Sequence, residues 1–147
     1  MKKAILIFSA LFFTIALFES CDKTGCTDPD SMNYDPKATQ DDGSCQYQGQ
    51  VVLWFDKTTR TKLLNMGAIS LTYFLDGYEV GKTSAAAAQD AEPGCGQAGP
   101  VTATKNIGNV KTLSVKYEVY ETGTATLYFS GNVTVVANQC VKVKLVK

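Results

Sequence analysis

The cysteines of this chain are the residues whose type and spacing say most about its chemistry. The sequence contains five cysteines and no histidine. An odd number of thiols is a liability in an oxidising compartment, so one cysteine is expected to serve a purpose other than a disulfide. A zinc site is a weak alternative use, because neither a CxxC spacing nor a histidine is present. We therefore predict two disulfides and one cysteine with a separate role.

Cys21 directly follows a segment that is typical of exported proteins. Two lysines precede an apolar run over residues 4–18, which is shorter than the ~20 residues that cross a bilayer. Leu17 and Ser20, placed before Cys21, resemble the lipobox of bacterial lipoproteins in its looser Bacteroidetes form. The resemblance implies that residues 1–20 are a signal peptide and that lipidated Cys21 is a membrane anchor in the cell envelope, with the outer membrane as the expected location. An ordinary secretory signal that ends near a cysteine is the alternative.

The four cysteines that remain can pair in three ways. We favour a disulfide between Cys26 and Cys45, because both lie inside one short acidic segment, and this leaves Cys95 with Cys140. In the chain-entropy model, closing the long loop between Cys95 and Cys140 stabilises the fold by roughly 3 to 4 kcal/mol.

Charge divides the mature chain into two parts. Residues 21–47 carry six aspartates against two lysines, whereas residues 48–147 carry seven acids and ten bases. The first part is too small and too poor in apolar residues to bury a core, whereas the second has the size of one ordinary domain. The near-neutral total argues against nucleic acid as a partner. We predict an acidic tether over residues 21–48 and a domain over residues 49–147.

The acidic part resembles a known short repeat. Residues 25–47 read GCTDPDSMNYDPKATQDDGSCQY, which closely resembles the GCTDPxAxNYxPxATxDDGSCxY repeat of exported and cell-surface proteins of Bacteroidetes. The resemblance implies a compact, turn-rich segment closed by a disulfide, and it brings no established catalytic activity. The residues agree, because Asp-Pro and Asp-Gly pairs are turn signals and a disulfide must replace the missing core.

The oxygen-bearing side chains of this segment are also candidate calcium ligands, since calcium takes six to eight oxygen ligands. The candidates are Asp28, Asp30, Asn33, Asp35, Asp41 and Asp42. Their spacing is not that of an EF-hand. We favour turn capping as their role, and a calcium site in a calcium-dependent adhesion module stays open as the alternative.

The larger part has the pattern of an all-β domain, with runs rich in β-branched and aromatic residues between turn signals. Strands are expected at Gln50–Asp56, Ala68–Asp76, Tyr78–Thr83, Val101–Lys105, Thr112–Glu121, Ala125–Ala137 and Gln139–Val146. About seven strands in a hundred residues predict an antiparallel β-sandwich, and a partly open barrel is the alternative.

Two features of this domain refine the expectation. Asp76-Gly77 predicts a type I′ hairpin turn. Residues 84–100 contain four consecutive alanines, two prolines and three glycines, which predicts a loop that the Cys95–Cys140 disulfide holds over the sheet. The stretch LTYFLDGYEVGKT weakly resembles PEGA-type and carboxypeptidase-regulatory-like sandwich modules.

The residues of the domain do not favour catalysis. Without histidine the chain lacks Ser-His and Cys-His nucleophiles. The basic stretch Lys57–Arg60 is expected to be a solvated turn, and no Gly-rich phosphate cradle is present. A hydrolase that uses two converging carboxylates is the alternative.

We therefore expect a non-catalytic binding or structural accessory module, with calcium as its candidate cofactor. The expected partners are the membrane, through the lipid, and an envelope protein or glycan. Exposure of Trp54, Tyr78, Tyr120 or Tyr128 at one loop end would favour binding, and a uniformly polar surface would favour a structural role.

Overall fold

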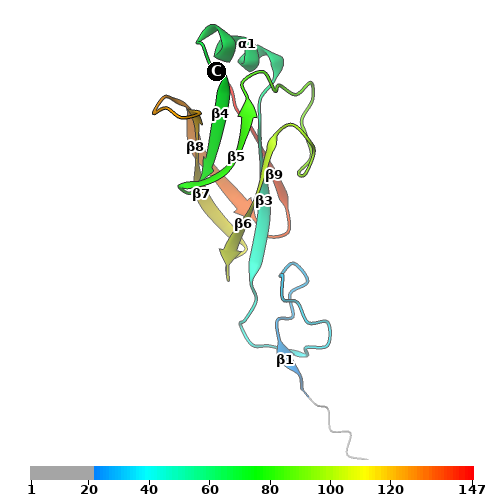
Figure 1. The fold of residues 1–147 in the computed structure, drawn as a ribbon. Helices are drawn as coiled ribbons and strands as arrows, with labels where there is room; N and C mark the ends of the chain where they lie inside the picture. The colour runs from blue at the N-terminus through cyan, green and yellow to red at the C-terminus, as the bar shows by residue number, and fades with distance from the viewer. Residues whose placement is uncertain (1–21) are drawn as a thin grey trace, which may run out of the picture.

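The computed structural model describes residues 22–147, so the predicted signal peptide and the lipidation site Cys21 lie outside the described residues. Figure 1 shows a small N-terminal part at one end of an elongated molecule, and two packed sheets that make up the rest. We call residues 22–46 the knob. β3 begins at Tyr47, so this strand crosses the predicted boundary between residues 48 and 49.

The knob contains little regular structure. Two short parallel strands, β1 (Thr24–Gly25) and β2 (Gln40–Asp41), form its only sheet among the described residues. The predicted disulfide between Cys26 and Cys45 is present, and both cysteines are buried. The knob is therefore built from turns around one disulfide, as its composition requires.

The domain is an all-β sandwich, as predicted. Its three-stranded sheet has the order β6-β3-β9 and its four-stranded sheet the order β5-β4-β7-β8. The strands are β3 (Tyr47–Trp54), β4 (Ser70–Leu75), β5 (Tyr78–Ser84), β6 (Val101–Gly108), β7 (Thr112–Glu121), β8 (Leu127–Val136) and β9 (Cys140–Lys144). Alternate side chains of both sheets enter one core, in which Val51, Leu53, Leu71, Tyr73 and Val119 are almost fully buried.

The predicted basic turn at residues 57–60 is wrong, because these residues begin the helix α1 (Lys57–Asn65). The Asp56 side chain accepts a hydrogen bond of 2.9 Å from the backbone N–H of Thr59, which is an N-cap. Thr59 and Leu63, one turn apart, are buried on the face that packs against the domain. Local capping and tertiary burial together outweigh the poor helix propensity of the threonines.

The sandwich is also not wholly antiparallel. β9 pairs with β3 in parallel, with Val51 opposite Val141 and Leu53 opposite Val143. The sequence predicted an antiparallel sandwich, whereas the chain passes from one sheet to the other at residues 137–139, where Asn138 has a φ of 55°. A strand that changes sheets is free to pair in either direction, and here it completes the three-stranded sheet beside β3.

Residues 85–100 cross the outer face of the three-stranded sheet, as the sequence predicted. Val52 and Trp54 point away from the main core, yet both are buried, and so is Pro93 of the loop. Three contacts hold the loop to this face: the Cys95–Cys140 disulfide, the Glu92–Lys142 ion pair and the hydrogen bond from Gly96 N to Thr102 Oγ1. The loop thus closes a second, smaller apolar cluster.

Candidate functional site

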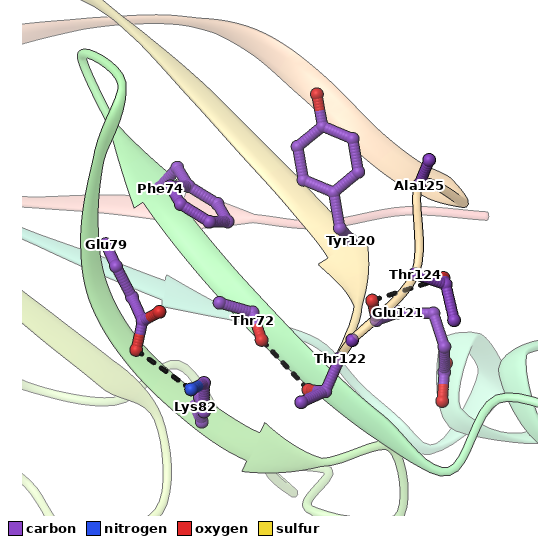
Figure 2. Close-up of a pocket in the computed structure, with 10 residues that line it drawn as sticks. Thr72, Phe74, Glu79, Lys82, Tyr120, Glu121, Thr122, Thr124 and Ala125 are labelled. Carbon is purple, nitrogen blue, oxygen red and sulfur yellow. Dashed lines mark hydrogen bonds and ion pairs between the residues drawn. The ribbon is translucent and has the colours of Figure 1, made fainter.

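The outer face of the four-stranded sheet carries a pocket of about 500 Å³, which we call the sheet-face pocket. Phe74 of β4 and Tyr120 of β7 form its floor, with their ring centroids 5.8 Å apart and the rings at 87°. Figure 2 shows both rings rising from neighbouring strands, with Glu79 and Lys82 on one side and the turn that follows β7 on the other. The pocket volume lies in the ~300–1,000 Å³ range of small-molecule sites.

Sheet register brings these residues onto one face. Thr72 of β4 lies opposite Tyr120 of β7 and Lys82 of β5, and Phe74 lies opposite Glu118 and Glu79. Opposed residues point to the same face of a sheet, so three strands contribute to a single surface. The intervening residues of β4 enter the core, which leaves Phe74 with no role in the main core cluster.

A chain of hydroxyl groups runs along one side of the pocket. The Thr72 and Thr122 hydroxyl oxygens are 2.9 Å apart, and the Thr122 hydroxyl donates to Ser70 Oγ at 3.0 Å. The Ser70 hydroxyl in turn donates to the carbonyl oxygen of Thr83 at 3.3 Å. These bonds link β4, β5 and the turn after β7, so the hydroxyls are held in fixed positions before any ligand arrives.

The charged groups on this face are paired. Lys82 Nζ lies 3.1 Å from Glu79 Oε1, and Lys116 Nζ lies 2.7 Å from Glu118 Oε1. The hydrogen bond from Lys116 lowers the pKa of Glu118. The Tyr120 hydroxyl donates to the same carboxylate at 3.1 Å, and this bond, with burial, raises the pKa of Tyr120. Tyr120 therefore remains a neutral hydroxyl in a fixed orientation.

Glu121 supports the wall of the pocket. Its Oε1 accepts hydrogen bonds from the backbone N–H groups of Ile69, at 3.1 Å, and Ser70, at 3.2 Å. The Thr124 hydroxyl donates to the carbonyl oxygen of Glu121 at 3.3 Å, and Thr126 N donates to Thr124 Oγ1 at 3.1 Å. These contacts fix the turn between β7 and β8 against the start of β4.

The aromatic residues named from the sequence do not gather at one loop end. Trp54 and Tyr128 are each only 7% exposed, so neither offers a free surface. Tyr78 is 73% exposed at the turn before β5, where Lys105 Nζ lies 5.9 Å from its ring centroid. Of the four, Tyr120 lines the pocket, and its neighbour Phe74 was missed. The sequence could have indicated Phe74, because this aromatic residue lies between the buried alternate residues of its strand and so points to the outer face.

The candidate calcium ligands act as turn caps in the structure. Asp28, Asp35, Asp41 and Asp42 each accept a hydrogen bond from the backbone N–H two residues later. Asn33 joins the middle of the knob to its C-terminal end, because its amide donates to Ser44 O and accepts from Gln46 N, both at 2.8 Å.

Lysines engage three of these aspartates. The ion pairs are Lys23 with Asp35 at 2.5 Å, Lys111 with Asp28 at 2.5 Å and Lys111 with Asp30 at 3.7 Å. Within residues 22–147, no group of three or more Asp, Glu, Cys or His side chains is arranged to hold a metal ion. In the same part of the chain, no helix has the length and apolar character to cross a membrane.

Comparisons with known proteins add one short match. No family model matches the chain, and no solved structure matches it. A stretch of 23 residues is 70% identical to the chloroplastic ribulose bisphosphate carboxylase/oxygenase activase of Spinacia oleracea. The match covers 16% of this chain and 5% of the activase, so the chain spans a very small part of that protein. A resemblance of this length does not show a family.

Proposed function

We propose that the protein is a lipid-anchored, non-catalytic binding module of the cell envelope, and that the sheet-face pocket is its binding site. The observation that carries the proposal is the Phe74–Tyr120 pair, which lines a pocket of about 500 Å³ on a sheet face outside the main core. Aromatic side chains that are left partly exposed in a concave site, with a few fixed polar groups, are typical of binding sites.

The position of the pocket suits a tethered receptor. β7 runs from Thr112, beside the knob contact at Lys111, to Glu121 at the pocket wall. Its ten residues span on the order of 30 Å at ~3.3 Å per residue. In Figure 1 the knob lies at the opposite end of the molecule from the turn after β7. A lipid at Cys21 would therefore leave the pocket facing away from the membrane.

The carboxylates of this face support binding rather than hydrolysis. Glycoside hydrolysis needs two converging carboxyl groups, one of which is held protonated by a raised pKa. Glu79 pairs with Lys82, Glu118 pairs with Lys116 and has a lowered pKa, and Glu121 accepts two backbone N–H groups. Each of these carboxylates is therefore already engaged by a lysine or by backbone N–H groups.

Photo-cross-linking in the native cell tests this proposal. A photoreactive amino acid at position 82, on the pocket rim, is compared with one at position 142, on the other sheet beside the covering loop. We expect position 82 to form a specific adduct with an envelope protein or glycan and position 142 to form none. Equal labelling from both positions, or labelling from 142 alone, would contradict the assignment of the pocket.

A further inference from the structure

The aromatic floor of the sheet-face pocket sets the shape of its ligand. Phe74 and Tyr120 present ring carbon atoms rather than polar groups, and the edge-to-face geometry leaves one ring face free to be covered. The face of an aromatic ring carries partial negative charge, so it attracts C–H groups with partial positive charge. Such C–H groups line the apolar face of a pyranose ring.

The polar groups around this floor match hydroxyl groups. The Thr72, Thr122 and Thr124 hydroxyls and the Glu79–Lys82 pair surround the rings. The oxygens of the three threonines and the Glu79 carboxylate can accept hydrogen bonds, the Lys82 ammonium can donate them, and a sugar hydroxyl is at once a donor and an acceptor. A ligand with an apolar ring face and a rim of hydroxyls therefore meets matching groups on both the floor and the walls.

The face carries two lysines and three glutamates, and both lysines are paired, which selects against a charged ligand. Each of the two lysines lies within an ion pair, 3.1 Å from Glu79 or 2.7 Å from Glu118. An anionic ligand would have to displace a carboxylate from its lysine. A cationic ligand would have to displace a lysine, because Glu121 Oε2, which has no hydrogen-bond partner, is buried. Glu121, the remaining charge, is bound to the N–H groups of Ile69 and Ser70. Neither lysine of this face is therefore free to bind an acidic group of a ligand.

We propose that the sheet-face pocket, the binding site of the proposed function on which this inference rests, takes a neutral saccharide whose apolar ring face packs against the Phe74–Tyr120 pair. The size of the pocket agrees, because its volume of about 500 Å³ lies within the ~300–1,000 Å³ range of sites that hold one small ligand.

The test uses the full mature chain with Cys21→Ser, labelled with ¹⁵N and titrated with neutral and anionic probes. The neutral probes are maltopentaose, cellopentaose, mannopentaose and xylopentaose, and the anionic probe is an oligogalacturonate of similar length. We expect at least one neutral probe to shift the amide resonances of Thr72, Phe74, Tyr120 and Thr122. Its affinity should change less than about twofold between low and high salt, because no net charge is neutralised on binding.

Three variants test whether the saccharide binds in the sheet-face pocket. Phe74→Ala should weaken binding by about tenfold or more, as expected for loss of a central aromatic contact. Lys82→Ala, on the edge strand β5, should weaken it without disturbing the core, and this variant stands in if Phe74→Ala fails to fold. Tyr78→Ala is the matched control, since Tyr78 is an exposed aromatic outside the pocket, and it should bind like the wild type.

Other outcomes overturn the inference in distinguishable ways. Binding of the oligogalacturonate alone, weakened by salt, would replace the neutral ligand by an anionic one and leave the pocket as the binding site. A protein adduct from position 82 with no shift from any saccharide would make the partner a protein, again with the proposed function intact. The absence of both would overturn the inference and the proposed function together.

Discussion

Lys111, the residue before β7, forms an ion pair with Asp28 of the knob, with 2.5 Å between Nζ and Oδ2. The Tyr47 hydroxyl donates to the same carboxylate oxygen at 2.9 Å, and the Lys111 ammonium lies 5.8 Å from the centroid of the Tyr47 ring. One knob residue is thus held by two residues of the sandwich. The knob is fixed against the domain rather than joined to it by a free linker.

This contact predicts a pH dependence for the position of the knob. The hydrogen bond from Lys111, followed by those from the Asp30 N–H and the Tyr47 hydroxyl, lowers the pKa of Asp28 from 3.8 to about 2. Because the pKa of Asp28 is lower in the folded state, the contact stabilises the fold fully when the pH is above the unfolded-state pKa. This stabilisation is lost as the pH falls through the folded-state pKa. Backbone ¹⁵N relaxation should therefore show the knob tumbling with the sandwich near neutral pH and separately as the pH falls from about 4 to about 2.

Asp28→Asn provides the control for this measurement. It should free the knob at neutral pH and remove most of the change between about pH 4 and 2. A knob that tumbles with the sandwich in this variant would contradict the role of the Asp28–Lys111 pair.

The hairpin turn predicts the effect of one glycine substitution. Asp76 and Gly77 have φ values of 55° and 81°, as a type I′ turn requires, and a Cβ at Gly77 would meet no atom within 4 Å. The cost of Gly77→Val is therefore conformational, and it should lower the free energy of unfolding by more than ~1 kcal/mol. Chemical denaturation measures it. Gly94→Ala is the control, since Gly94 is equally open but has no left-handed φ, and an equal loss there would refute the turn argument.

The covering loop predicts where the protein opens first when its disulfide is removed. Changing Cys95→Ser together with Cys140→Ser should lower stability by roughly 2 to 4 kcal/mol. Limited proteolysis should then cut mainly between residues 84 and 99, because the exposed Glu92–Lys142 ion pair and the exposed hydrogen bond from Gly96 N to Thr102 Oγ1 hold the loop only weakly. The pair Cys26→Ser with Cys45→Ser is the control and should leave this loop protected. Cleavage spread evenly over the sandwich would contradict a role confined to the loop.

The sequence predicted those features that depend on a local residue pattern or on the odd number of cysteines. Both disulfides were predicted by setting Cys21 aside and pairing Cys26 with Cys45 inside the acidic segment. β7 was predicted with its observed bounds, Thr112–Glu121, because its alternation is unbroken. The features that were missed depend on distant contacts. α1 is stabilised by burial of Leu63 rather than by propensity, and β9 pairs in parallel with a strand ninety residues earlier in the chain. The pocket needs Phe74 and Tyr120 in register across two strands, which alternation alone does not specify.

The proposed lipid anchor at Cys21, outside the described residues, is tested by chemistry on the intact protein. If Cys21 carries lipid, labelled palmitate should enter the wild-type protein and not Cys21→Ser. The variant should also leave the detergent phase when membranes are partitioned, since one cysteine provides the whole attachment. Unchanged partitioning of Cys21→Ser would contradict the lipoprotein assignment.

The binding role of the sheet-face pocket is tested most directly by adding detergent-solubilised native envelope to the ¹⁵N-labelled mature chain and recording which amide resonances shift or broaden. The account predicts changes concentrated on Thr72, Phe74, Lys82, Tyr120 and Thr122, and their loss in Phe74→Ala but not in Tyr78→Ala. A second exposed apolar group lies at and after the end of α1 and consists of Leu64, Met66 and Ile69. Changes confined to that group or to the knob, with the pocket resonances unmoved, would contradict the account.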